Sequence, residues 1–264
     1  MKILSIGNSF STDAQRWLHG ISLCEGGEEI ECINLYIGGC SLSRHHRNMV
    51  EDNCDYEYER NGIHTVVKVS LSEALSSGNY HAVTFQQTSR TSGISRSYFP
   101  YITELDAYVR EKQPGARRLF HQTWAYEWDS THRAFIHYAN NTDEMTRRIV
   151  DASETVAYLM GAELIRSGEF IDYLRKNVPL FDYQGGGLSL NRDGYHLTKN
   201  YGRFAVAALW YAALTGNCPK NSEGFMEYVG DNGDERITFD AETVKLILDS
   251  LAVFLSLEEK ERPV

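Results

Sequence analysis

The chain has 264 residues, of which 42% are hydrophobic, and this length allows one large domain or two small ones around a sizeable core. Its formal net charge of -10 argues against a nucleic-acid partner, because binding to phosphates needs a basic face. Five cysteines without any C-x-x-C spacing argue against both a zinc site and a disulfide framework.

Targeting signals are absent from the sequence as it stands. No signal peptide precedes the first apolar run, and no stretch of about 18 apolar residues is present that would cross a membrane. The simplest prediction is a cytoplasmic protein without a membrane partner. A secretory chain trimmed of its signal peptide would show the same pattern, and the sequence leaves the oligomeric state open.

The first residues predict a buried strand, a tight turn and a helix. An apolar run stops at Gly7, and the polar residues Asn8, Ser9 and Ser11 follow directly. Polar side chains at this point favour the start of a helix, because their oxygens accept the free N–H groups of its first turn. A doubly wound sheet carries its reactive groups at such strand–turn–helix junctions, so Ser9 is the candidate nucleophile.

Strands and helices alternate through the rest of the chain. The hydrophobic pattern predicts helices over residues 12–24, 97–113, 142–161, 199–215 and 241–257, and further strands over 28–37, 81–85 and 117–123. This alternation predicts an α/β fold, with a parallel sheet covered by helices on both faces, in a single domain over residues 1–264.

Two segments depart from the alternation. Residues 55–69 are interpreted as a small inserted β-hairpin, because Asn61-Gly62 suits the two positive-φ positions of a type I′ turn. Residues 125–140 are polar and aromatic without periodicity, and they are interpreted as a loop or lid.

Four stretches are expected to meet at the carboxyl edge of a parallel sheet: residues 7–9, 38–39, 86–87 and 193–196. An acyl-transfer site needs a nucleophile, a base, a group that orients the base, and donors for the oxyanion. In this pattern Ser9 is the nucleophile, His196 is the base, and Asp193 holds the imidazole. The backbone N–H groups of Ser9 and Gly39 and the side-chain amide of Gln87 are the predicted oxyanion donors.

These blocks resemble those of the SGNH (GDSL-type) hydrolases. Residues 7–11 (Gly-Asn-Ser-Phe-Ser) are similar to the first block of that family, and Gly39 falls where its second block has an oxyanion glycine. Residues 193–196 (Asp-Gly-Tyr-His) are similar to its last block, Asp-x-x-His. The resemblance implies a three-layer α/β/α sandwich of flavodoxin-like type and a serine hydrolase that acts on esters of carbohydrates, lipids or small molecules.

The third block departs from the family pattern. The usual Gly-x-Asn-Asp is replaced by Gln-Gln-Thr-Ser at residues 86–89. A glutamine amide is the same donor on a longer arm, so we expect Gln87, or alternatively Gln86, to replace the family's asparagine. Asn8 stands where the family frequently has aspartate, and it fixes the turn by hydrogen bonding without charge.

Other polar and aromatic residues have weaker patterns. The candidate pocket residues are Asn8, Gln86, Gln122 and Trp124. Gln122 and Trp124 end a predicted strand, although core packing explains Trp124 equally well. His45 and His46 fit no spacing of metal ligands and are interpreted as solvated loop histidines.

The sequence therefore favours a serine esterase that needs no cofactor or metal. The first expectation is a short-chain (acetyl) esterase for a carbohydrate or another small molecule, because aromatic residues, 12% of the chain, suit sugar faces. A lipid- or thioester-directed acyl hydrolase would need a wide apolar pocket. A binding protein that kept the fold and lost catalysis would explain the changed third block.

Overall fold

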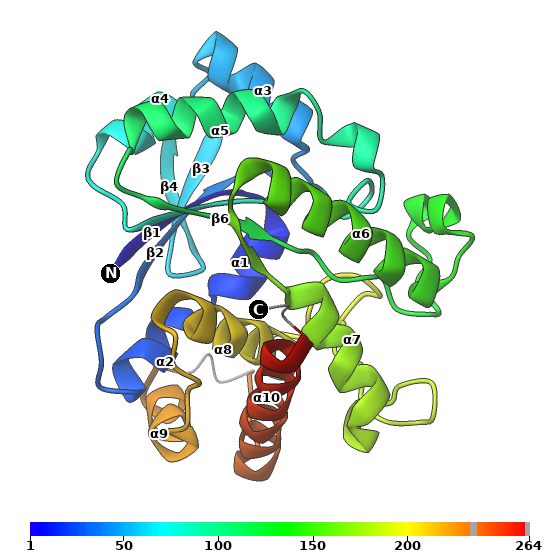
Figure 1. Ribbon diagram of the computed structural model, residues 1–264. Coiled ribbons are helices and arrows are strands. Elements are labelled where there is room, and N and C mark those ends of the chain that lie inside the picture. The colour runs from blue at the N-terminus through cyan, green and yellow to red at the C-terminus, as the bar shows by residue number, and fades with distance from the viewer. Residues whose placement is uncertain (233–236, 262–264) are drawn as a thin grey trace.

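A central sheet organises the structure (Figure 1). The computed structural model describes residues 1–232 and 237–261, and within them the sheet has seven strands. In spatial order the strands are β4 (Ile63–Val69), β3 (Tyr56–Arg60), β2 (Glu31–Tyr36), β1 (Lys2–Gly7), β5 (Ala82–Phe85), β6 (Arg117–His121) and β7 (Glu163–Ile165). The five strands β2, β1, β5, β6 and β7 are parallel to one another. At the other edge β3 pairs antiparallel with β2, and β4 pairs antiparallel with β3.

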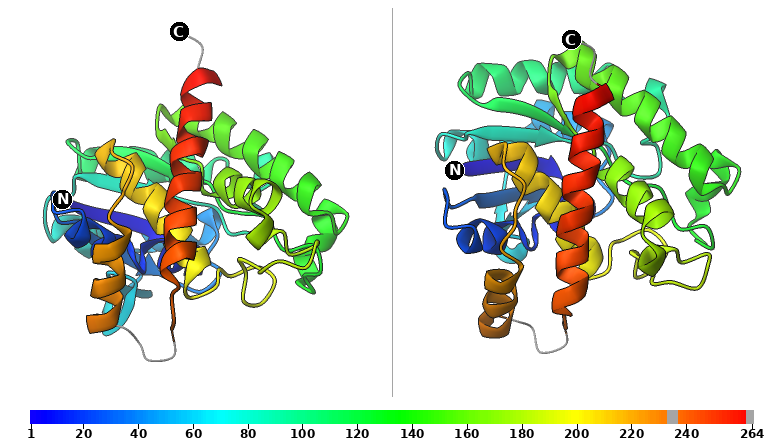
Figure 2. Two further views of the ribbon diagram at one scale, coloured as in Figure 1. Left: turned by 90° about the horizontal axis from the view of Figure 1, so that it is seen from below. Right: turned by 60° about the horizontal axis from the view of Figure 1, so that its bottom comes forward.

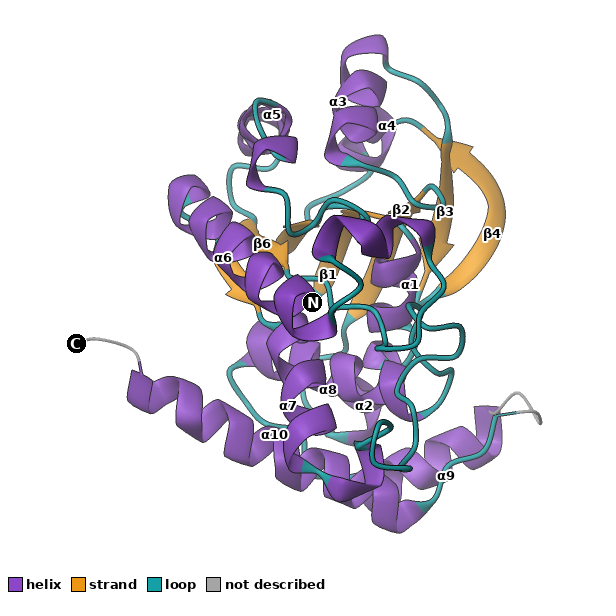
Figure 3. Cartoon of the chain, turned by 90° about the vertical axis from the view of Figure 1, so that its right-hand side faces the viewer, coloured by secondary structure: helices purple, strands orange, loops and turns teal. Residues whose placement is uncertain are grey.

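Helices cover both faces of this sheet (Figure 3). On one face lie α3 (Leu42–Glu51), α4 (Leu71–Ser76), α5 (Tyr101–Lys112) and the second half of α6 (Thr142–Met160). The other face is covered by α1 (Ser9–Gln15), α2 (Leu18–Cys24), α7 (Ser167–Asn177), α8 (Tyr201–Thr215), α9 (Ser222–Asn232) and α10 (Ala241–Glu261). Helix α10 packs against α7, α8 and α9 at the outside of this layer (Figure 2). The predicted three-layer α/β/α architecture is confirmed.

Each face of the sheet has its own hydrophobic core. Side chains alternate between the faces of a strand, so neighbouring residues of β1 belong to different cores. Ile3 packs with α1, α2 and α8, whereas Leu4 packs with the core under α3 to α5, and both side chains are fully buried. This burial on both faces explains why β1 is a short apolar run without polar alternation.

The predicted hairpin exists, but it is part of the sheet. Asn61 and Gly62 both have positive φ, as the type I′ prediction requires. Strand β3 continues the sheet by pairing with β2, with Asn34 opposite Glu59. The sheet is therefore mixed at this edge, because a two-residue turn can only join antiparallel strands.

The helix predicted over residues 12–24 is two helices. Helix α1 ends at Gln15, and α2 begins at Leu18, after Trp17 as its N-cap residue. The buried Trp17 indole donates a hydrogen bond to the Lys199 carbonyl oxygen at 2.9 Å. Tertiary packing of one large side chain thus accompanies a break that the apolar pattern does not show.

The interpretation of His45 and His46 as solvated loop residues is wrong. Both lie on α3, a helix that the sequence reading missed together with α9. His45 is fully buried beside the Tyr56 hydroxyl, and burial lowers its pKa to about 3. His46 contacts the Glu104 carboxylate at 2.6 Å. In the described ranges no group of His, Cys, Asp and Glu side chains is arranged to hold a metal ion.

Within residues 1–232 and 237–261, no helix has both the length and the apolar character needed to cross a membrane.

Candidate active site

Ser9 is the first residue of α1, at the carboxyl end of β1. Asn8 caps this helix: it is extended, and its side-chain oxygen accepts the Phe10 N–H at 3.0 Å. Gly7 has to be glycine, because a Cβ there would lie 2.1 Å from Ser11 Oγ. The chain crosses from β2 on one side of β1 to β5 on the other, so Ser9 lies at the switch point of the sheet, where such folds bind ligands.

The structure brings Ser9, His196 and Asp193 into one hydrogen-bonded series. Ser9 Oγ lies 2.9 Å from His196 Nε2, and His196 Nδ1 lies 2.7 Å from Asp193 Oδ2. With the proton on Nδ1 donated to the carboxylate, Nε2 is free to accept the serine proton. This arrangement has the geometry of a nucleophile, a general base and the group that orients the base.

The Asp193 carboxylate is held in its charged form. Partial burial by itself would raise the pKa of Asp193, but hydrogen bonds from the side chain and the backbone N–H of His196 outweigh it. The Tyr195 backbone N–H adds a further donor. The pKa of Asp193 is therefore lowered, and an ionised carboxylate faces the imidazole at neutral pH.

The loop that carries Asp193 and His196 is tied to the helix that carries the nucleophile. An isolated antiparallel bridge between Asn191 and Leu197 closes the loop. The buried Asp13 carboxylate on α1 accepts the Leu197 N–H at 2.9 Å and the Arg203 Nε at 2.7 Å. Helix α1 thus positions both the nucleophile and, through Asp13, the base.

Trp124 lies beneath this loop rather than in a pocket. Its ring stacks on Phe10 at a centroid distance of 4.2 Å, and its indole N–H donates to the Tyr195 carbonyl oxygen at 2.7 Å. The side chain is fully buried. The core-packing alternative therefore describes Trp124, which supports the loop of the base from below.

Two backbone N–H groups are available for an oxyanion. Among the residues that the structure describes, neither the Ser9 nor the Gly39 N–H has a hydrogen-bond acceptor, and both residues line the same cavity. Gly39 has φ +59, and a Cβ there would meet nothing within 4 Å. Glycine is therefore favoured at position 39 by its left-handed backbone, not by lack of space.

The glutamines of the third block do not face this cavity. The Gln87 amide nitrogen donates to the carbonyl and hydroxyl oxygens of Ser97, at 3.0 and 3.1 Å. Its side-chain oxygen accepts the backbone N–H groups of Leu42 and Thr88. The prediction that Gln87 donates to the oxyanion is therefore wrong for this structure. Both ends of its amide hold loops together instead.

Gln86, the alternative donor, is engaged as well. Its amide nitrogen donates to Asn8 Oδ1, while its oxygen accepts hydrogen bonds from Ser11 Oγ and His121 Nδ1. Burial lowers the pKa of His121 to about 3, so this histidine is neutral and donates from Nδ1. Gln86 therefore supports the nucleophile turn from behind.

Thr88 follows the two glutamines and, unlike them, is a lining residue of the Ser9 cavity. It lines the cavity with Ser9 and Gly39, and its hydroxyl has no hydrogen-bond partner within the described part of the chain. Sequence reasoning missed Thr88 because it searched the third block for an amide. The signal was present as a hydroxyl residue directly after Gln87.

The cavity next to Ser9 has a volume of about 300 Å³. Asn8 lines it as predicted, but Gln122 does not: the Gln122 amide is buried against Ser153 and Glu169. Residues that the sequence analysis did not select complete the lining: Phe10, Tyr36, Gly38, Ser89, Arg90, His132, Arg133 and Tyr195. Gly38 and Tyr195 lie in stretches that the sequence analysis placed at the edge of the sheet, whereas the fold alone brings the others to the cavity.

Residues 125–140 form part of this wall. The segment contains a short 3₁₀ helix, Arg133–Tyr138, and its side chains Tyr126, Phe135 and Tyr138 pack into a small core with α6. His132 and Arg133 from this segment line the Ser9 cavity. In this structure the segment is packed against the molecule.

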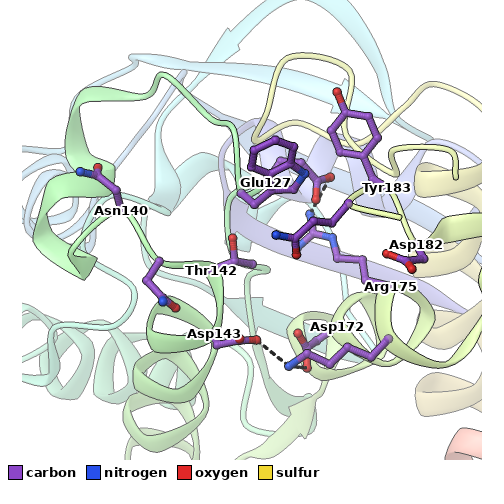
Figure 4. A pocket seen from close by; sticks show the side chains of 12 residues that line it. Glu127, Asn140, Thr142, Asp143, Asp172, Arg175, Asp182 and Tyr183 are labelled. Atoms are coloured by element: carbon purple, nitrogen blue, oxygen red, sulfur yellow. Dashed lines mark hydrogen bonds and ion pairs between the residues drawn. The ribbon is translucent and has the colours of Figure 1, made fainter. Parts of the chain in front are cut away.

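A separate cavity of about 460 Å³ lies between α6, α7 and the loop near Tyr183 (Figure 4). Glu127 and Arg175 form an ion pair in it, and Lys176 binds Asp143 at 2.7 Å. None of Ser9, His196 and Asp193 lines this cavity.

The architecture and the position of the site define an SGNH-hydrolase fold. A lipase/acylhydrolase from Enterococcus faecalis superimposes with a TM-score of 0.52 at 12% identity, covering 81% of this chain and 95% of that protein. A proposed SGNH hydrolase from Slackia heliotrinireducens gives a TM-score of 0.54 at 20% identity, with 80% and 97% covered. The resemblance seen in the sequence blocks is thus confirmed at the level of the fold.

Within this fold class the chain belongs to the DUF4886 family, described as a domain of unknown function, whose signature matches residues 2–229. A DUF4886 family protein from Bacteroides uniformis ATCC 8492 is 32% identical, with a TM-score of 0.83 and with 98% of this chain and 95% of that protein covered. No curated protein sequence matches the chain.

Proposed function

We propose that this protein is a serine hydrolase that cleaves short-chain carboxylic esters, acetyl esters above all, on a carbohydrate or another small molecule. The observation that carries the proposal is the hydrogen-bonded series from Ser9 through His196 to Asp193, opening onto a cavity with two unengaged N–H groups. The fold shared with hydrolases of the SGNH type supports the same chemistry.

Each step of the reaction uses a group of this chain. Ser9 Oγ attacks the ester carbonyl while His196 Nε2 takes its proton, and the Asp193 carboxylate stabilises the imidazolium that forms. The negative oxygen of the tetrahedral intermediate accepts hydrogen bonds from the N–H groups of Ser9 and Gly39 and from the Thr88 hydroxyl. The carbon–oxygen bond to the alcohol then breaks, and the alcohol leaves with the proton from His196. Water attacks the acyl-enzyme with His196 as base and releases the acid.

The small acyl group is supported by the lining of the cavity. In the described residues no aliphatic side chain lines the 300 Å³ cavity, whose walls are glycines, hydroxyls, arginines and aromatic rings. A long acyl chain would find little apolar surface there, and burial of apolar surface is what would bind it. The rings of Tyr36 and Tyr195 suit the apolar face of a sugar.

The test is hydrolysis of p-nitrophenyl esters from acetyl to decanoyl, wild type beside Ser9→Ala, together with labelling by a fluorophosphonate probe. Turnover of the acetyl ester is expected to fall at least about 10³-fold in Ser9→Ala, without a change in melting temperature, because the nucleophile is lost. Ser89→Ala is the matched control, since Ser89 lines the same cavity and its hydroxyl contacts Tyr126, and it should keep the label.

Three outcomes would change the proposal. Wild-type turnover by Ser9→Ala would remove Ser9 as nucleophile. A preference for decanoyl esters would favour a lipid-directed acyl hydrolase. Neither turnover nor labelling of the wild type would favour a binding protein that retains the fold.

A further inference from the structure

A second, larger cavity adjoins the one at Ser9. Its volume is about 770 Å³, and it shares Thr88, Arg90 and Arg133 with the smaller cavity as lining residues. Arg96 lines the larger cavity but not the smaller one. Two guanidinium groups, those of Arg90 and Arg133, are therefore shared by the two cavities, and a third, that of Arg96, lines the larger one.

None of these three cations is neutralised by a carboxylate among the residues that the structure describes. Within residues 1–232 and 237–261, the Arg90 side chain makes one hydrogen bond, from Nη2 to the Gly39 carbonyl oxygen at 3.2 Å. No ion pair involves Arg90, Arg96 or Arg133, and no aspartate or glutamate in the described ranges lines either cavity.

A group of three arginines without acidic neighbours is unexpected in a chain with a net charge of -10. The protein has 36 acidic and 26 basic side chains. From this composition most arginines are expected to lie near a carboxylate. The cavity near Tyr183 shows the contrast: four carboxylates line it, and its Arg175 and Lys176 are both in ion pairs (Figure 4). A guanidinium fork matches the geometry of carboxylate, sulfate and phosphate oxygens.

The pKa of His132, which lines the Ser9 cavity, is affected by the positive charges of two of these arginines. Burial lowers the pKa of His132, and the positive charges of Arg90 and Arg133 lower it further. His132 is thus uncharged at neutral pH and adds a hydrogen-bonding imidazole, while the positive charge of the wall comes from the arginines.

We propose that the substrate is an ester whose alcohol part carries an anionic oxygen group, a carboxylate, sulfate or phosphate, which Arg90, Arg96 and Arg133 bind while Ser9 attacks the acyl carbon. The inference rests on the proposed function, in which the small cavity takes the acyl group. The alcohol part is then the portion of the substrate that extends past Arg90 into the larger cavity. Attack by Ser9 releases this alcohol with a proton from His196, and no further reactant enters.

The kinetic test compares esters that differ in charge at one position. The probes are 4-acetoxybenzoate, its neutral analogue 4-acetoxybenzamide, and the sulfate and phosphate monoesters of 4-acetoxyphenol. We expect kcat/KM for an anionic probe to exceed that for the amide by about 10- to 100-fold, as charge-assisted hydrogen bonds allow. The best of the three anions identifies the group that the site takes, and an equal or lower value for all three would overturn the inference.

The variants remove the charges of Arg96, which lines only the larger cavity, and of Arg133, which lines both cavities. Arg96→Gln with Arg133→Gln should lower the ratio of anionic to neutral kcat/KM by about tenfold, and added salt should lower it in the wild type. Arg90 is left intact, because it contacts the Gly39 carbonyl next to the oxyanion donors. Arg147→Gln is the matched control: Arg147 lies on α6, pairs with Glu144 and Asp151, and lines neither cavity. An unchanged ratio in the double variant would contradict the assignment.

Binding to Ser9→Ala separates this inference from the proposed function. Ligand-observed NMR titrations should show tighter binding of 4-acetoxybenzoate than of 4-acetoxybenzamide, with the difference lost in the double arginine variant. Charge-selective binding without any turnover by the wild type would leave the anion site in place and remove the esterase. Turnover of the esters without charge preference would keep the esterase and remove the anion site. Absent or equal binding of the two ligands would overturn the anion site.

Discussion

At the residue scale the third block has a hydroxyl side chain, and neither of its glutamine amides, in the wall of the Ser9 cavity. The Gln87 amide joins the start of α3, its own loop and Ser97. This leaves the Thr88 hydroxyl, which has no partner among the described residues, in the wall of the Ser9 cavity. We infer that Gln87 positions the loop, while Thr88 supplies the third donor to the oxyanion.

Removal of the Thr88 hydroxyl tests this assignment. Thr88→Val keeps the shape of the side chain, and kcat for the acetyl ester is expected to fall about 10²-fold, as for other oxyanion donors, with little change in KM. Thr88→Ser should restore most of the rate, because it keeps the hydroxyl. A Thr88→Val enzyme with wild-type kcat would exclude Thr88 from the oxyanion hole.

At the element scale the edge hairpin is connected to the nucleophile helix by one buried acid. Glu59 of β3 has a fully buried side chain, which accepts hydrogen bonds from Thr12 Oγ1 of α1 and Asn34 Nδ2 of β2. Burial raises the pKa of Glu59, although these hydrogen bonds oppose it. The hairpin thus carries a carboxylate whose charged form is disfavoured by folding.

This raised pKa predicts a pH dependence of stability. A folded pKa above the unfolded value contributes stability that is fully present below pH 4.5 and is lost as the pH rises through the folded pKa. Thermal melts from pH 4.5 to neutrality should therefore show a smaller loss of Tm in Glu59→Gln than in the wild type. Glu57→Gln is the control, because the partly exposed Glu57 contacts the same His64. Parallel Tm curves for Glu59→Gln and the wild type would contradict a raised pKa.

At the scale of the whole molecule the two cores share one sheet. Ile3 and Leu4 are neighbours in β1 and are fully buried in opposite cores. Because β1 is hydrogen-bonded to both β2 and β5, loss of either core removes support from the same strand. The single domain predicted from the sequence should therefore unfold as one unit.

Calorimetry of two matched variants tests this cooperativity. Ile3→Ala and Leu4→Ala should each lower the free energy of unfolding by about 2–5 kcal/mol, because each leaves a cavity in a packed core. Both should shift one and the same transition, with equal calorimetric and van't Hoff enthalpies. Two transitions, each moved by only one of the variants, would show that the cores fold independently.

The sequence by itself determined the layers of the fold and the residues that meet at the edge of the sheet. The run before Gly7, the turn at Ser9 and the block from Asp193 to His196 are local patterns, and local sterics and capping decide them. Their convergence follows from a rule of topology, because parallel strands present their carboxyl ends at one edge.

Only the tertiary structure decided which polar group faces the cavity and which charges surround it. Hydrogen bonds with Ser97 and Leu42 direct the amide of Gln87. The break before α2 accompanies the packing of Trp17. The local sequence pattern indicates neither of these. Arg90 lies in a turn and Arg133 begins a short 3₁₀ helix, and the packing of residues 125–140 brings both to the same cavities. Side-chain direction is a competition among partners distant in the sequence, and a linear pattern does not contain its outcome.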